Sequence, residues 1–264
     1  MLPVVQLGSL ALPVPGLALL LGVWVALGLA EHEAKRLTLN AEAIYNLAVA
    51  GLVAGLIGAR LVYVGRYWTI YAQDLLGAFS LNAAALAPAE GALIGLAAAF
   101  IYGSRRQLPW RATLDALAPG LAAFAVAVAA AHVAGGDAFG APTAVPWRIF
   151  LWEEYRHPSQ IYEAVAALGI LALGWRVRRR RPFVGFNFLL IVALSAAARL
   201  VLEAFRGDSL VLAGGWRAAQ VGGLVVLAAS LMAMRAWSRG EALPNTPPPV
   251  ATERGAGTEV GEAG

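Results

Sequence analysis

The chain contains no cysteine among its 264 residues, which excludes disulfide bonds, thiolate metal sites, lipidated cysteines and a cysteine nucleophile supplied by the chain itself. It is also poor in charge, because Asp, Glu, Lys and Arg make up 14% of the residues, against about 25% in an ordinary soluble domain. Hydrophobic residues reach 59%, and the mean hydropathy is +0.67. So few polar residues cannot cover the surface of a globular protein in water, and the composition therefore predicts a membrane protein.

Long apolar runs recur at the length that crosses a bilayer as a helix, about 20 residues. We expect seven spans at approximately residues 10–30, 42–66, 89–104, 112–135, 159–176, 184–204 and 214–236, separated by charged, Pro-rich or Gly-rich connections. The predicted fold is therefore an all-α polytopic membrane bundle that forms one domain over residues 1–239. Residues 240–264, rich in Pro, Gly, Thr and Glu, are expected to be a disordered cytoplasmic tail.

Lys and Arg are distributed unevenly between alternate connections. Twelve lie after the first, third and fifth spans and around the end of the seventh: Lys35, Arg36, Arg105, Arg106, Arg111, Arg176, Arg178, Arg179, Arg180, Arg181, Arg235 and Arg239. Five lie on the opposite side: Arg66, Arg148, Arg156, Arg206 and Arg217. Because basic residues accumulate on the cytoplasmic side, we predict an outside N-terminus and an inside C-terminus. The arginine run at 178–181 fits this orientation signal, and binding to anionic headgroups is its alternative.

Charged residues also occur within the apolar runs, where an ionised side chain costs at least about 2.5–3.5 kcal/mol and therefore suggests function. Arg199 and Glu203 are one helical turn apart and can form an ion pair, while Arg206 continues the same face. The plain alternative is that these charges only neutralise one another inside the bundle. Asp115 lies at the start of its span, where a helix N-terminus favours a carboxylate, so we expect it to be a cap.

The densest polar cluster opens the fifth predicted span. It consists of Tyr155, Arg156, His157, Pro158, Ser159, Gln160, Ile161, Tyr162 and Glu163. Pro and Ser suit a helix start, but a helix start does not require the other polar residues. Arg60 and Tyr63 lie toward the same outer side, in the second span. Several guanidinium groups there suit a phosphate, because arginine offers paired donors and keeps its charge, and a phospholipid headgroup is the obvious anion at that depth.

Segments over roughly residues 50–230 resemble, in order, the prolipoprotein diacylglyceryl transferase family. These seven-helix membrane enzymes move diacylglyceryl from phosphatidylglycerol onto a lipobox cysteine. The most specific matches are RHPSQIYE at 156–163 and RLVLEAFR at 199–206. The remaining matches are GLIGARLVYV at 55–64, GALIG at 91–95, DALAP at 115–119, GAPT at 140–143, PW at 146–147 and Gln220.

The resemblance implies that the chain transfers diacylglyceryl from phosphatidylglycerol to prolipoproteins in the bacterial inner membrane, without a cofactor. It makes Arg199 the expected catalytic contact to the phosphate. The expected substrate-binding residues are Arg60, Tyr63, His157, Gln160, Glu163, Glu203 and Arg206. We expect neither a metal, since the three histidines lack ligand spacing, nor a nucleic-acid partner. His32 is expected to be solvated, in a loop formed by residues 31–36.

The chain departs from the family pattern at positions that bear on chemistry. The family usually has His-Gly-Gly where Glu90, Gly91 and Ala92 stand here, and a family arginine and asparagine are replaced by Ala129 and His132. The reaction needs a base to activate the acceptor thiol, and we predict Glu90 or His132 for this role. Two alternatives remain open: a divergent phospholipid-binding member with a different or no transfer activity, and a small membrane transporter.

Overall fold

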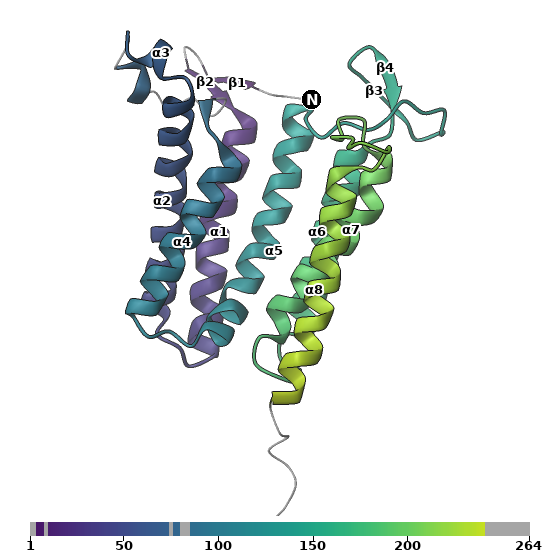
Figure 1. Ribbon diagram of the computed structural model, residues 1–264. Coiled ribbons are helices and arrows are strands. Elements are labelled where there is room, and N and C mark those ends of the chain that lie inside the picture. Colours follow the sequence, from purple (N-terminus) through teal and green to yellow (C-terminus); the bar gives the residue numbers. More distant parts are fainter. Residues whose placement is uncertain (1–3, 8–9, 74–75, 80–84, 241–264) are drawn as a thin grey trace, which may run out of the picture.

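The computed structural model describes residues 4–7, 10–73, 76–79 and 85–240 and is a bundle of long helices with short strands at one end (Figure 1). The long helices are α1 (Val14–Arg36), α2 (Ala41–Arg66), α4 (Pro88–Arg105), α5 (Trp110–Gly135), α6 (Ser159–Val177), α7 (Phe186–Leu202) and α8 (Ala218–Gly240). Within the described residues, five of them (α1, α2, α5, α7 and α8) are long and apolar enough to cross a membrane. The predicted all-α membrane bundle is confirmed at this level, whereas residues 241–264 of the predicted tail lie outside the described part.

Short elements gather at one end of the bundle, which we call the hairpin end (Figure 1). They are α3 (Trp68–Tyr71), the 3-10 turns η1 (Gly77–Phe79) and η3 (Glu203–Phe205), and two antiparallel hairpins, β1 (Val4–Leu7) with β2 (Leu10–Pro13) and β3 (Ile149–Leu151) with β4 (Glu154–Arg156). The hairpins were not predicted. Residues 10–13, assigned to the first span, form a strand instead, and α1 begins after Pro13 with a second proline in its first turn, where proline is well tolerated.

The helices pack in close pairs, α1 along α5, α2 along α4 and α7 along α8. Glycines explain the approach of α2 to α4. A Cβ on Gly91 would lie 2.7 Å from the carbonyl oxygen of Gly55, and a Cβ on Gly95 would lie 2.6 Å from that of Gly51. Small residues let helix backbones approach in this way inside membranes, where packing replaces the hydrophobic effect as the driving force.

Buried ion pairs close the end of the bundle opposite the hairpins. Glu33 is fully buried, binds Arg36 one turn away and lies 3.3 Å from Arg178. Residues 31–36, predicted as a loop, therefore continue α1, because Glu33 gains charged partners there; His32 is exposed as expected. Burial lowers the pKa of Arg178 from its ordinary value while the charge of Glu33 opposes that shift, and an arginine keeps its charge throughout.

Asp115 caps a helix, but not the helix that carries it. Its buried carboxylate accepts hydrogen bonds from the backbone N–H groups of Gly185 at 2.7 Å and Phe188 at 3.1 Å, at the start of α7. It also pairs with Arg181 at 3.3 Å. Arg178 and Arg181 both belong to the basic run that predicts the orientation. Through Glu33 and Asp115 they also fasten the connection between α6 and α7 to α1 and α5.

Candidate functional site

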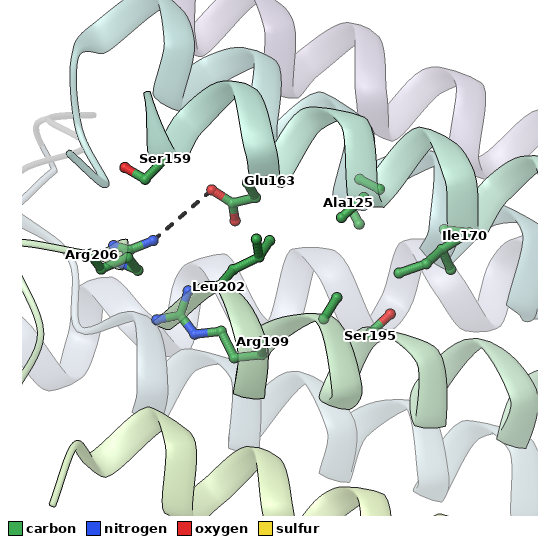
Figure 2. Close-up of a pocket in the computed structure, with 12 residues that line it drawn as sticks. Ala125, Ser159, Glu163, Ile170, Ser195, Arg199, Leu202 and Arg206 are labelled. Carbon is green, nitrogen blue, oxygen red and sulfur yellow. Dashed lines mark ion pairs between the residues drawn. The ribbon is translucent and has the colours of Figure 1, made fainter. Parts of the chain in front are cut away.

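A cavity of 120 Å³ lies between α5, α6 and α7, toward the hairpin end. Its polar lining is Ser159, Glu163, Ser195, Arg199 and Arg206. The apolar lining is Ala122, Ala125, Ala166, Ala167, Ile170, Ala198 and Leu202. Figure 2 shows Glu163 on one wall facing the two arginines across the cavity, with the apolar side chain of Ile170 farther along. A cavity that is charged at one end and apolar toward the other suits an anionic amphiphile.

A buried carboxylate fixes the two arginines. Glu203 is 1% exposed, and its Oε2 lies 3.1 Å from Nη2 of Arg199 and 3.9 Å from Nε of Arg206. The predicted ion pair between Arg199 and Glu203 is therefore present. Arg206 makes a second, two-pronged contact with Asp208 at 2.9 and 2.7 Å, whereas the Arg199 side chain is 41% exposed. Arg199 is accordingly the guanidinium more available to a bound anion.

His132, in the last turn of α5, reaches the same group of charges. Its Nδ1 lies 2.8 Å from Oε2 of Glu163, and the two side chains are 28% and 27% exposed. The same carboxylate oxygen is 4.0 Å from Nη1 of Arg206. The carboxylate of Glu163 therefore joins a histidine from α5 to Arg206, which follows α7.

The segment around His157 forms the rim of this region. The His157 ring packs edge-on against Phe205 with 5.3 Å between ring centroids, and a Cβ on Gly140 would collide with the His157 carbonyl oxygen. Gln160 is 1% exposed, and neither polar atom of its amide has a hydrogen-bond partner among the described residues. Buried amides are rarely left unpaired, so Gln160 is an exceptional polar group beside the cavity.

Arg60 and Tyr63 occupy a different place, on α2. All three Arg60 nitrogens donate to backbone carbonyls of the connection between α3 and α4: those of Ala78 at 2.9 Å, Ala85 at 2.7 Å and Gly77 at 2.7 Å. Tyr63 packs on Tyr67, with 4.8 Å between ring centroids. Neither residue lines the cavity between α5, α6 and α7. Arg60 therefore holds a loop at the hairpin end.

Glu90 is likewise remote from that cavity. It lies in the first turn of α4, where its carboxylate pairs with Arg66 of α2 at 2.5 Å, and it does not line the cavity wall. The predicted single site is thus divided between two helix groups. The residues brought together are His132, Glu163, Arg199, Glu203 and Arg206, with His157 and Gln160 beside them.

Arg217 is a structural part of the site, whereas its place in the sequence predicted only a charge that helps to orient the chain. Its Nη1 donates to the carbonyl oxygens of Glu203 at 2.6 Å and Arg206 at 2.7 Å, and to the hydroxyl of Ser209 at 2.8 Å. It therefore clamps the turn that carries Glu203 and Arg206. The sequence offered one indication of this role: a positively charged residue in the connections on this side of the bundle, where arginine is scarce.

A second cavity borders the site. It has a volume of 330 Å³, lies between α5, α7 and α8, and shares Ser195 and Arg199 with the first one. Arg199 therefore lines both cavities, and each has apolar walls next to its charge. A larger, almost wholly apolar cavity of 700 Å³ lies elsewhere, between α1, α2, α4 and α5.

These features define a polytopic helical membrane protein with an arginine-lined pocket at one end. The chain belongs to the prolipoprotein diacylglyceryl transferase family, whose model matches residues 3–236. It is similar to proteins named phosphatidylglycerol–prolipoprotein diacylglyceryl transferase. Those of Clostridioides difficile (28% identity, 83% of this chain and 88% of the relative), Nostoc (29%, 88% and 87%) and Synechocystis (30%, 82% and 82%) are examples. The family membership predicted from the motifs is confirmed.

Proposed function

We propose that this protein transfers a diacylglyceryl group from phosphatidylglycerol to the lipobox cysteine of prolipoproteins. Its relatives carry this activity in their names. The observation that supports it most directly is Arg199, held by buried Glu203 at the polar end of a cavity that is mainly apolar toward its other end. A guanidinium suits a phosphate, and alanine and leucine side chains suit the hydrocarbon next to it.

The proposed roles are these. Arg199 neutralises the phosphate as it leaves with the bonding electrons, the step at which negative charge develops. Glu203 holds Arg199 in place and also lies near Arg206, and Glu163 faces both arginines. Gln160, which lies in the first turn of α6 beside the cavity-lining Ser159, binds the substrate lipid. His157 shapes the rim of the site. Arg60 contributes from α2 by fixing the loop at this end of the bundle, and Tyr63 contributes beside it, packed on Tyr67.

We also propose that all seven long helices cross the membrane, with the N-terminus outside and the C-terminus in the cytoplasm. Helices α4 and α6 have 18 and 19 residues. At about 1.5 Å per residue they extend for about 27–29 Å, close to the hydrocarbon thickness of about 30 Å. The cavity then opens in the outer half of the inner membrane, the side reached by exported prolipoproteins.

The departures from the family pattern favour a second candidate, a lipid-binding member without this transfer. Ala129 is fully buried where the family has an arginine, and Glu90 is already paired with Arg66. Neither position supplies a free charged group to the cavity between α5, α6 and α7. With the same substrates, the first candidate predicts a prolipoprotein that carries diacylglyceryl, and the second predicts an unmodified prolipoprotein.

The test is mass spectrometry of a lipobox-containing prolipoprotein incubated with phosphatidylglycerol and the purified protein. We expect the unmodified protein to add a diacylglyceryl mass and Arg199→Ala to add none. Arg148→Ala is the matched control, because that guanidinium lies in the exposed connection before β3 and does not line the cavity. Absence of added mass from folded protein that binds phosphatidylglycerol would favour the second candidate, and turnover by Arg199→Ala would remove this residue from the mechanism.

A further inference from the structure

We propose that His132 is the catalytic base that takes the proton of the acceptor thiol, and that Glu163 is the residue that positions it. This inference rests on the proposed transferase function. The sequence left two candidates for the base, Glu90 and His132. The structure separates them, because only His132 is joined to a side chain in the wall of the cavity that holds Arg199.

The contact between His132 and Glu163 selects the tautomer that a base needs. A carboxylate accepts but does not donate, so Nδ1 of His132, 2.8 Å from Oε2 of Glu163, carries the proton in the neutral ring. The lone pair then lies on Nε2, which makes no hydrogen bond to a described residue. With 28% of the side chain exposed, the ring has room to meet a substrate group.

The charges around this pair suit proton transfer followed by departure of a phosphate. Glu163 stabilises a protonated imidazole on one side, while Arg206, 4.0 Å from the same carboxylate oxygen, and Arg199 in the same cavity wall supply positive charge for the leaving group. Glu203 and Asp208 bind those arginines and limit their repulsion toward His132. Glu163 thus contacts both the proposed base and Arg206, and Arg199 lines the same cavity.

The reaction is balanced without an enzyme nucleophile or a cofactor. The thiol proton of the acceptor cysteine passes to Nε2 of His132, and the sulfur forms a bond to the terminal carbon of the diacylglyceryl group. The bond between that carbon and the phosphate oxygen breaks, and the oxygen keeps the electron pair as glycerol phosphate leaves. The imidazolium then gives its proton to the departing phosphate, which restores the base.

The discriminating experiment compares two synthetic lipobox peptides, one with cysteine and one with selenocysteine, as acceptors for purified protein in phosphatidylglycerol micelles. The thiolate is the reactive form of cysteine, and a selenol is already ionised at neutral pH and needs no base. We expect His132→Ala to lose about 10²-fold or more of the rate with cysteine but no more than about threefold with selenocysteine, since general base catalysis contributes at that scale. Activity of the variant with selenocysteine also shows that it is folded.

The matched control is His32→Ala, at the opposite end of the bundle, which should keep both rates. Equal losses with both peptides would assign His132 a structural or binding role and overturn the proposal, as would an unchanged rate with cysteine. Failure of the unmodified protein with both peptides, while it still binds phosphatidylglycerol, would instead reject the transferase function itself, and the base assignment with it.

The positioning role of Glu163 is tested by the double variant. We expect Glu163→Gln to lower kcat about tenfold with the cysteine peptide, but to cost less than about threefold when it is introduced into His132→Ala, because residues that act as a unit are not additive. Multiplicative losses would show that Glu163 acts independently of His132 and would overturn this part of the proposal.

A pH series supplies an independent readout. A cysteine thiol ionises by itself near pH 8.5, so the requirement for a base fades above that value. The defect of His132→Ala with the cysteine peptide should therefore shrink as the pH rises from about 7 to about 9.5. A defect that is constant over this range would contradict the assignment of His132 as the base.

Discussion

At the scale of single residues, the arginines at the hairpin end divide into those that are open and those that are saturated. Arg60 gives its donors to three carbonyls and Arg206 binds Asp208 with two nitrogens, whereas Arg199 has one buried carboxylate and an exposed remainder. A substrate anion competes least with existing partners at Arg199. The residue type does not distinguish these cases. They differ in how many N–H donors of each arginine already have a partner.

Arg217 offers a test of how far the turn between α7 and α8 supports the site. Arg217→Ala removes the donor shared by the backbone of Glu203, the backbone of Arg206 and Ser209. We expect it to lower the free energy of unfolding by about 2 kcal/mol, the size of a lost hydrogen bond to a charged group. Thermal unfolding in detergent measures this loss, with Arg148→Ala as the control. A midpoint equal to that of the control would show that the clamp is dispensable.

The site was predictable from the sequence where its contacts are local. Arg199 and Glu203 pair across one helical turn, a spacing that can be seen in the sequence. The contact between His132 and Glu163 joins residues 31 positions apart on different helices, so it depends on how α5 packs on α6. For the same reason the sequence could not separate Arg60 from the cavity, because its partners belong to a loop that folds back onto α2.

At the scale of elements, Asp115 couples the start of one helix to the body of another. Asp115→Asn keeps an oxygen that can accept one N–H of α7 but loses the charge that pairs with Arg181. We expect a loss of about 1–3 kcal/mol in unfolding free energy, as for a buried group deprived of its partner. Glu31→Gln is the control, because its partner Lys35 is mostly exposed and surface pairs contribute about 0–1 kcal/mol. Equal unfolding midpoints for the two variants would refute this account.

The pairing of α2 with α4 rests on glycine. Gly95→Ala would place a Cβ 2.6 Å from the carbonyl oxygen of Gly51 and 3.3 Å from Cα of Gly55, so the helices must separate. We expect a loss of about 1–3 kcal/mol from overpacking. Gly65→Ala, also within a helix of this pair, meets no atom within 4 Å and should be neutral or stabilising by about 0.5–1 kcal/mol. Denaturation of the two variants side by side measures the difference, and equal losses would contradict this packing.

The long helices were predictable because hydropathy and length determine them, and each predicted span corresponds to a helix. The misassigned segments are those in which a tertiary contact outweighs composition. The charge of residues 31–36 is typical of a loop. Glu33 nevertheless forms ion pairs with Arg36 and Arg178, and the helix continues through this segment. The strands β3 and β4 are three residues each, too short for a periodic signal.

At the scale of the whole molecule, the two ends of the bundle differ in kind. Buried pairs at Glu33 and Asp115 close one end, whereas the other end carries partly exposed charges around a cavity. The closed end holds the connections richer in Lys and Arg, so the arginines that fasten its helices are also those on which the predicted orientation rests. In the orientation that we propose, the open end faces the side on which prolipoproteins arrive, which ties the proposed activity to that orientation.

That orientation can be tested directly, because the chain has no cysteine of its own. Ala144 lies exposed in the connection before β3, and Arg180 lies exposed in the connection after α6 at the opposite end. We expect a membrane-impermeant maleimide added to spheroplasts to label Ala144→Cys but not Arg180→Cys, because basic residues favour the cytoplasmic side. Both variants should be labelled once detergent is added, which shows that each thiol is reachable. Labelling of Arg180→Cys alone in intact spheroplasts would reverse the orientation and place the arginine-lined cavity on the cytoplasmic side, away from exported prolipoproteins.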